Sequence, residues 1–237
     1  MFDPNDLHIC LIGYDYQLNL YLNLDIIRKN YSFGDKIWVT TLYNGAKDEP
    51  INGLGENSYI PLEYNRGYQL GAFDLYKEAF RMAKLVNRKY TIVMNFDVWI
   101  VGEKAMVNLM EDFIQSGKRF MSGRDPNHDR PFCDITIYQT EHIPDLEEKY
   151  IKERNPHKVC LEEWLYRAMC VKYFGEDFTY QEKMLDPYWH EMDRGEDPFF
   201  WSEKTKILHT HIGSLKKDCL IANRIDKGNF VRGFLKG

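Results

Sequence analysis

Three short groups of residues have types and spacings that could support chemistry. The first follows the apolar run Tyr90–Asn95, which is continued by Phe96 and Asp97. In open α/β sheets, ligands bind at the carboxyl ends of the strands, so Asp97 is well placed to hold a divalent cation. The Asn95 amide could add a neutral oxygen, and Mg²⁺ and Mn²⁺ prefer such hard ligands. The alternative is that Asp97 only caps the turn before Val98.

The second group is a pair of histidines, His209 and His211, followed by Gly213, Lys216 and Lys217. In an extended segment, side chains two residues apart point to the same side, so the two imidazoles could share one metal ion. The two lysines would then neutralise a phosphate as point charges. The alternative is one core histidine and one surface histidine.

The third group is Glu162-Glu163, at the start of an apolar-periodic stretch, Cys160–Met169, that predicts a helix. A carboxylate held at a helix start could act as a general base. Acidic residues in a first helical turn are also favoured by the helix dipole, so helix stabilisation explains the pair equally well.

The elements that must position these groups follow from the apolar pattern. We expect strands at Leu7–Gly13, Lys36–Tyr43, Ser58–Glu63, Tyr90–Asn95, Arg119–Gly123 and Cys133–Tyr138. We expect helices at Tyr16–Asn30, Tyr68–Leu85, Lys104–Gln115, Pro144–Arg154 and Cys160–Met169, whereas Asp186–Trp201 has no clear period. Pro61 cannot donate to a ladder, which puts its strand at a sheet edge. This order indicates an α/β fold: an open, mostly parallel central sheet flanked by helices.

Composition and charge exclude several classes of protein. The longest stretch without a charged residue, Ile37–Ala46, is ten residues long, far below the ~20 that a spanning helix needs. The five cysteines have no CxxC spacing, which favours a reducing, cytoplasmic compartment over a disulfide framework. The net charge of −5 argues against a nucleic-acid partner. The net charge of +6 from Lys204 to Gly237 would suit a phosphate or an anionic surface.

Five short motifs, taken in their order along the chain, link the three groups. They are Tyr43-Asn44-Gly45-Ala46 after a strand, Asn65-Arg66-Gly67 with Gly71-Ala72 and Asp74, MNFDVWIV, Leu161-Glu162-Glu163-Trp164-Leu165, and His209 or His211. In this order they resemble the motifs of the GT-A nucleotide-sugar glycosyltransferases, especially the family-2-like members. The resemblance runs from about Leu7 to Lys217.

The resemblance implies a single GT-A-like (Rossmann-like) domain over residues 1–237. Residues 1–100 would form the nucleotide-binding half, 101–217 the acceptor and catalytic half, and 218–237 a basic C-terminal segment. The implied activity is transfer of a sugar from a nucleotide-diphospho-sugar, with a UDP-sugar favoured, to a hydroxyl of a glycan or lipid-linked acceptor. Peripheral contact with the inner face of a membrane, through the C-terminal segment, would suit a lipid-linked acceptor.

The resemblance also implies roles for individual residues. The donor nucleotide would contact Tyr14, Asp15, Asn44, Asn65, Gly67, Asn95, Lys216 and Lys217. Asp97 and one of His209 and His211 would hold Mn²⁺ or Mg²⁺ across the diphosphate. Glu163, with Glu162 in reserve, would deprotonate the acceptor hydroxyl for in-line attack, which predicts inversion of the anomeric carbon.

Three departures from the family pattern keep alternatives open. Asn95 replaces the first acid of the D-x-D metal motif, which is the best support for a binding module without catalysis. Glu162-Glu163 replaces the expected Glu-Asp. The spacing His211–Lys216 is one residue shorter than in some retaining relatives, so retention is not excluded. A sugar nucleotidyltransferase is disfavoured, because Gly13–Tyr16 has one glycine and no basic residue for a phosphate loop.

Overall fold

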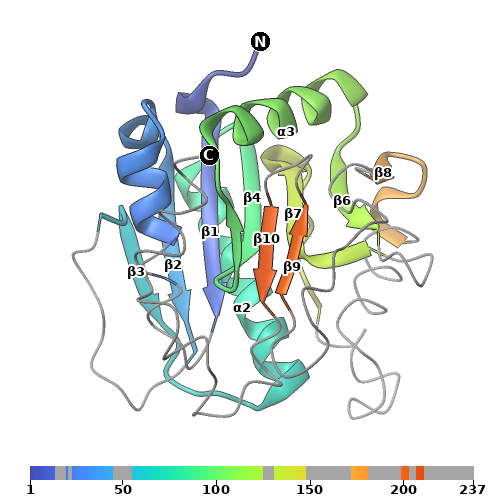
Figure 1. Ribbon diagram of the computed structural model, residues 1–237. Coiled ribbons are helices and arrows are strands. Elements are labelled where there is room, and N and C mark those ends of the chain that lie inside the picture. Colours follow the sequence, from blue (N-terminus) through green and yellow to red (C-terminus); the bar gives the residue numbers. More distant parts are fainter. Residues whose placement is uncertain are drawn as a thin grey trace.

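The computed structural model describes residues 1–13, 20, 23–44, 55–124, 131–147, 172–180, 199–202 and 207–210. Within them, the chain forms a seven-stranded sheet and a three-stranded sheet, with helices against them (Figure 1).

The seven-stranded sheet is the mostly parallel sheet that the sequence predicts, with one further strand, Phe178–Tyr180, that the sequence does not predict. Its strands are β1 (Leu7–Gly13), β2 (Trp38–Tyr43), β3 (Ser58–Pro61), β4 (Tyr90–Asn95), β6 (Phe120–Arg124), β7 (Pro131–Gln139) and β8 (Phe178–Tyr180). They lie in the order β3-β2-β1-β4-β7-β6-β8. The pairings of β7 with β4 and β6 are antiparallel, and the other pairings are parallel. Pro61 lies in the edge strand β3, as expected.

Alternation along the strands divides the core into two layers, one on each face of the sheet. On one face, Leu7, Ile9 and Leu11 belong to the apolar cluster that contains the buried side of α3 (Glu103–Ser116). On the other face, Cys10 and Ile12 pack with the buried side of α2 (Tyr68–Val86). All seven residues of β1 are buried, and burying one large apolar side chain contributes about 1.5–3 kcal/mol. The two layers therefore hold β1 at the centre.

The three-stranded sheet was not predicted from the sequence. It contains β5 (Val98–Ile100), β10 (Ile207–Thr210) and β9 (Phe199–Ser202) in that order, with antiparallel pairing. β5 lies in the same apolar cluster as α3, and Figure 1 shows the small sheet on the α3 side of the large one. Strands of three or four residues are too short to show a period, so most of Phe199–Ser202 falls in the segment Asp186–Trp201, which has no clear period in the sequence.

Two of the expected helices differ in detail from the structure. The described part of Tyr16–Asn30 is helical, but it ends in a π-helix, Ile26–Asn30. Residues 144–147 are not helical, so a helix does not begin at Pro144. Cys160–Met169 lies outside the described residues. In the part of the chain that the structure describes, no helix combines the length and apolar character needed to cross a membrane.

Candidate donor-binding site

The order of the strands creates a switch point between β1 and β4. From β1 the chain continues to β2 and β3 on one side, then returns through α2 to β4 on the other side. Connections that leave two adjacent parallel strands in opposite directions open a crevice at the carboxyl ends of those strands, where ligands bind in open α/β sheets. Here these ends are Gly13 and Asn95, whose strands pair directly.

The turn that follows β4 is held against the end of β1. The Phe96 amide donates to the Ile12 carbonyl at 2.9 Å, and the Asn23 side chain donates to the Phe96 carbonyl at 2.8 Å. The Phe96 ring occupies the space beside Gly13, where a Cβ would lie 1.4 Å from Cδ1 of the ring. A side chain at position 13 would therefore clash with the Phe96 ring, so glycine there allows the turn after β4 to pack against the end of β1.

The Asp97 carboxyl group lies in a buried, negatively charged environment. The residue as a whole is partly buried, but its Oδ1 has no contact with solvent. Burial raises the pKa of Asp97 well above its ordinary value, and the negative charge of Asp134 raises this pKa further. A hydrogen bond from the backbone of Asp97 acts in the opposite direction. A bound cation would reverse the repulsion between the two carboxylates.

Asp134 was missed by the sequence analysis, although it lies directly across from the motif. Met94 pairs with Ile135, so the antiparallel register places Asn95 opposite Asp134, and the Asn95 amide donates to Asp134 Oδ1. Asp134 is 8% exposed. A buried carboxylate within a mostly apolar strand is rare without a partner or a function. That signal could have singled out Asp134, but only the register shows which residues it meets.

The register of the small sheet brings His209 to the same region. His209 pairs with Val98, the residue that follows Asp97. His211 lies outside the described residues, and the role of either histidine as a metal ligand stays a prediction. Within the described residues, no three His, Cys, Asp or Glu side chains form a complete metal site. At the end of β4 the structure describes two neighbouring carboxylates, those of Asp97 and Asp134, which fits a cation that also takes oxygens from a substrate phosphate.

Asn44, Asn65 and Gly71 join the end of β2 to the start of α2. The Asn44 side chain donates to the Gly71 carbonyl at 3.2 Å, and Asn65 donates to the Asn44 carbonyl at 2.9 Å. Asn65 also accepts from the Gly67 amide at 2.9 Å. A Cβ at position 71 would lie 2.6 Å from Asn65 Oδ1. The motif thus positions the N-terminus of α2, and contact of Asn44, Asn65 or Gly67 with a donor stays a prediction.

A bidentate ion pair stabilises the same junction between the end of β2 and the start of α2. The Arg66 guanidinium donates to both carboxylate oxygens of Asp74, at 2.7 and 2.6 Å. Both side chains are partly buried, and such bidentate pairs fix orientation as well as adding energy. Asp74 is the acid that the sequence analysis placed in this motif, and its described contact is with Arg66.

The remaining predicted site residues lie outside the described residues, and their roles stay predictions. They are Tyr14, Asp15, Glu162, Glu163, Lys216 and Lys217. Gly13, which directly precedes Tyr14 in the sequence, is the last residue of β1.

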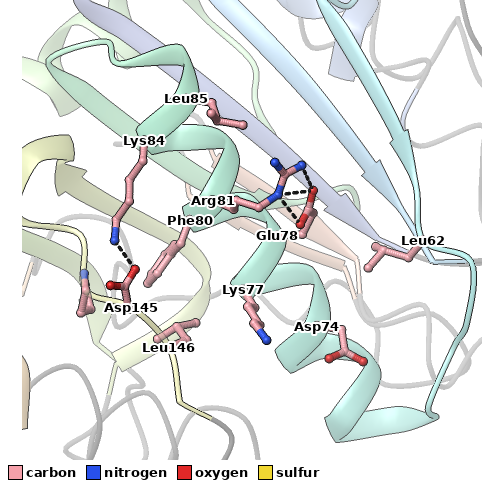
Figure 2. A pocket seen from close by; sticks show the side chains of 11 residues that line it. Leu62, Asp74, Lys77, Glu78, Phe80, Arg81, Lys84, Leu85, Asp145 and Leu146 are labelled. Carbon is pink, nitrogen blue, oxygen red and sulfur yellow. Dashed lines mark hydrogen bonds and ion pairs between the residues drawn. The ribbon is translucent and has the colours of Figure 1, made fainter.

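The structure also contains a cavity of about 520 Å³ along the outer side of α2 (Figure 2). Its lining combines apolar side chains, among them Leu62, Phe80 and Leu146, with paired charges. Lys84 and Asp145 are 2.5 Å apart there, and Arg81 pairs with Glu78. None of the residues predicted for catalysis, donor binding or metal binding lines this cavity.

Comparisons with known proteins bear on the fold. No family model and no curated protein sequence matches the chain. The galactosyltransferase LgtC, solved with donor and acceptor sugar analogues, matches 97% of this chain and 95% of its own length, with a TM-score of 0.59 and 8% identity. A structure of an active-site mutant of LgtC matches 95% of each chain, with a TM-score of 0.54 and 11% identity.

The glycosyltransferase GlyE of Streptococcus pneumoniae TIGR4 matches 74% of this chain, with a TM-score of 0.49 and 12% identity. The chain spans 45% of the length of GlyE. The likeness to LgtC shows the fold: a GT-A-like α/β fold, as the sequence predicted.

Proposed function

We propose that the chain is a glycosyltransferase that moves a sugar from a nucleotide-diphospho-sugar to a hydroxyl of a glycan or lipid-linked acceptor. A UDP-sugar is the favoured donor, and Mn²⁺ or Mg²⁺ is the favoured cofactor. The observation that carries the proposal is the buried Asp97 carboxyl group at the carboxyl end of β4. It lies beside the switch point of a GT-A-like fold.

The residues present fit a divalent cation. Asp97 and Asp134 raise the local negative charge, and the Asn95 amide lies beside them. When bound, the cation would neutralise the charge that grows on the leaving nucleoside diphosphate. Asp97 and His209 are the proposed protein ligands, and Lys216 and Lys217 are proposed to add positive charge at the diphosphate.

The acceptor side of the reaction depends on Glu163, with Glu162 as the alternative. This carboxylate would take the proton of the acceptor hydroxyl as the oxygen attacks the anomeric carbon from the side opposite the leaving group. Such a single displacement inverts the anomeric configuration. In this proposal, residues 1–100 bind the nucleotide and residues 101–217 bind the acceptor.

The test uses purified protein with a panel of UDP- and GDP-sugars, with Mn²⁺ or with EDTA. We expect a thermal shift with one nucleotide class, slow donor hydrolysis, and loss of the metal-dependent part of both in Asp97→Ala. Asp145→Ala is the matched control, because Asp145 is an exposed carboxylate paired with Lys84.

Three results would overturn the proposal. Absence of any shift or turnover with every nucleotide would exclude nucleotide-sugar chemistry. Release of pyrophosphate from a nucleoside triphosphate and a sugar phosphate would assign a nucleotidyltransferase instead. Tight binding of a nucleotide sugar, without turnover on water or any acceptor, would assign a binding module without catalysis.

A further inference from the structure

We propose that Asp134 supplies the carboxylate that the metal motif lacks at Asn95, so that Asp97 and Asp134 together hold the cation. The inference rests on the proposed function and deepens it, because it assigns the second acidic ligand to a different strand. The motif residues lie at the end of β4, whereas Asp134 lies in its antiparallel neighbour β7.

The contact between Asn95 and Asp134 shows how the charge is arranged. Asn95 donates its amide nitrogen to Asp134 Oδ1. A carboxylate only accepts, so this contact fixes which way the Asn95 amide is turned, with its oxygen away from Asp134. An aspartate at position 95 would instead place a carboxylate against Asp134, beside a third one at Asp97. An amide at position 95 is therefore compatible with the carboxylate at position 134, whereas a second carboxylate would be repelled by it.

The local backbone of β7 is irregular at the same place. Against β6, the register shifts between Ser122, which pairs with Thr136, and Gly123, which pairs with Phe132. Residues 133–135 therefore have no paired residue on β6, while Ile135 still pairs with Met94 of β4. Bulges of this kind re-aim side chains and are common beside active sites. Asp134 lies within this bulge, next to the end of β4.

The electrostatic relation between the two acids agrees with the geometry. The negative charge of Asp134 is the second cause that raises the pKa of Asp97, after burial. Two neighbouring carboxylates repel each other unless a cation or a proton lies with them. Asp97 and Asp134 therefore act as one group toward a cation, with Asn95 as a positioning residue.

The experiment measures Mn²⁺ binding by electron paramagnetic resonance of the free ion, with and without UDP. The variants are Asp134→Asn, Asn95→Asp and the swap Asn95→Asp/Asp134→Asn, with Asp145→Asn as the control. We expect Asp134→Asn to weaken Mn²⁺ binding at least about tenfold, because affinity follows the number of charged ligands. The swap should restore binding to within about threefold of the starting protein, and the control should not change it.

A purely structural role for Asp134 predicts a different pattern. It predicts that Asp134→Asn lowers the melting temperature while Mn²⁺ affinity is unchanged, which would overturn the inference. Absence of Mn²⁺ binding by the unmodified protein, with or without UDP, would overturn it too. If Asp134→Asn does not fold, Asp134→Glu and the swap Asn95→Asp/Asp134→Asn replace it, because both keep one negative charge at this pair. We expect both to retain Mn²⁺ binding and expect Asp97→Ala to remove it from each, and loss of binding in a folded charge-keeping variant would overturn the inference.

The same measurements separate this inference from the proposed function. Mn²⁺ binding that depends on Asp134, in a protein that binds no nucleotide, would uphold the inference and reject the glycosyltransferase proposal. Nucleotide-sugar turnover with unchanged Mn²⁺ affinity in Asp134→Asn would do the reverse.

Discussion

Buried polar residues occur near both ends of the central strands, and the two groups are built in opposite ways. Near the amino ends, His8 Nε2 lies 2.8 Å from Thr40 Oγ1, and the hydroxyls of Thr91 and Thr140 are 2.8 Å apart. Burial, with a smaller effect from Arg88, lowers the pKa of His8 to about 3, so this group is neutral. At the carboxyl ends, Asp97 and Asp134 have buried carboxyl groups that repel each other, and the Asn95 amide donates to Asp134.

The neutral group near the amino ends is expected to stabilise the fold, whereas the charged group at the carboxyl ends is expected to destabilise it. Satisfied neutral hydrogen bonds contribute about 0.5–1.5 kcal/mol each to folding. Acids placed together in a buried site cost stability, and proteins keep such arrangements where they bind or react. The two groups should therefore respond in opposite directions when their polar atoms are removed, and the following predictions test that contrast.

The largest effect on folding is expected when the pH is lowered, because His8 of the neutral group is then protonated in the unfolded chain. His8 has a lowered pKa in the folded protein, so between pH 6.5 and about 3 the unfolded chain binds the proton that the folded chain excludes. Stability from His8 is complete above pH 6.5 and falls with pH across this range, by at most about 5 kcal/mol. Urea unfolding of the protein and of His8→Gln, measured from pH 7 to pH 4, tests this.

The two curves should converge as the pH falls, because the glutamine does not titrate. Parallel curves would show that His8 is not held neutral by the fold.

The charged group should show the opposite response. Asp97→Asn is expected to reduce metal-dependent donor turnover at least about 100-fold, since it removes the charge that is proposed to hold the metal at the diphosphate. The same change should raise the free energy of unfolding without metal at pH 8, because the raised pKa of Asp97 reflects a penalty for its charge that grows from the unfolded-state pKa up to the raised folded-state pKa.

The measurements are donor hydrolysis and urea unfolding at pH 8 in EDTA, with Asp145→Asn as the control. If Asp97→Asn lowered stability in EDTA, the charged group would be structural and the contrast would fail.

The smallest effect is expected from removing one hydroxyl of the neutral group. Thr40→Val removes the 2.8 Å partner of His8 Nε2 and leaves this nitrogen with its longer contact to Cys10 Sγ at 3.4 Å, and loss of a buried hydrogen-bond partner costs about 1–3 kcal/mol. Urea unfolding should show this loss, while nucleotide and Mn²⁺ binding stay unchanged. A matched variant, Thr41→Val, tests a hydroxyl whose described contact with the Ser58 carbonyl is long, at 3.5 Å, and should cost less. Equal losses of unfolding free energy in the two variants would show that the contact of Thr40 with His8 contributes no more than the long contact of Thr41.

The sequence predicts the large sheet well where an apolar run has a sharp end. Leu7–Gly13 and Tyr90–Asn95 match β1 and β4 residue for residue, because each run stops at a glycine or a polar residue. It does not predict β5, β9 or β10, whose pairing joins distant short segments.

The same limit applies to the candidate site. Asp97 is found from the sequence because it directly follows a strand. Asp134 and the pairing of His209 with Val98 depend on register between strands, which no local pattern encodes.

The pairing of β5 with β10 has a consequence for synthesis of the chain. Ile100 and Ile207 are paired although they lie 107 positions apart. A ribosome that adds about 5–20 residues per second needs roughly 5–20 seconds to make the intervening segment. During that time the strand after Asp97 has an unpaired edge, which is a site where chains can associate wrongly. β10, the strand that carries His209, covers the β5 edge, so the nascent chain is exposed to such association until this distant segment has been made.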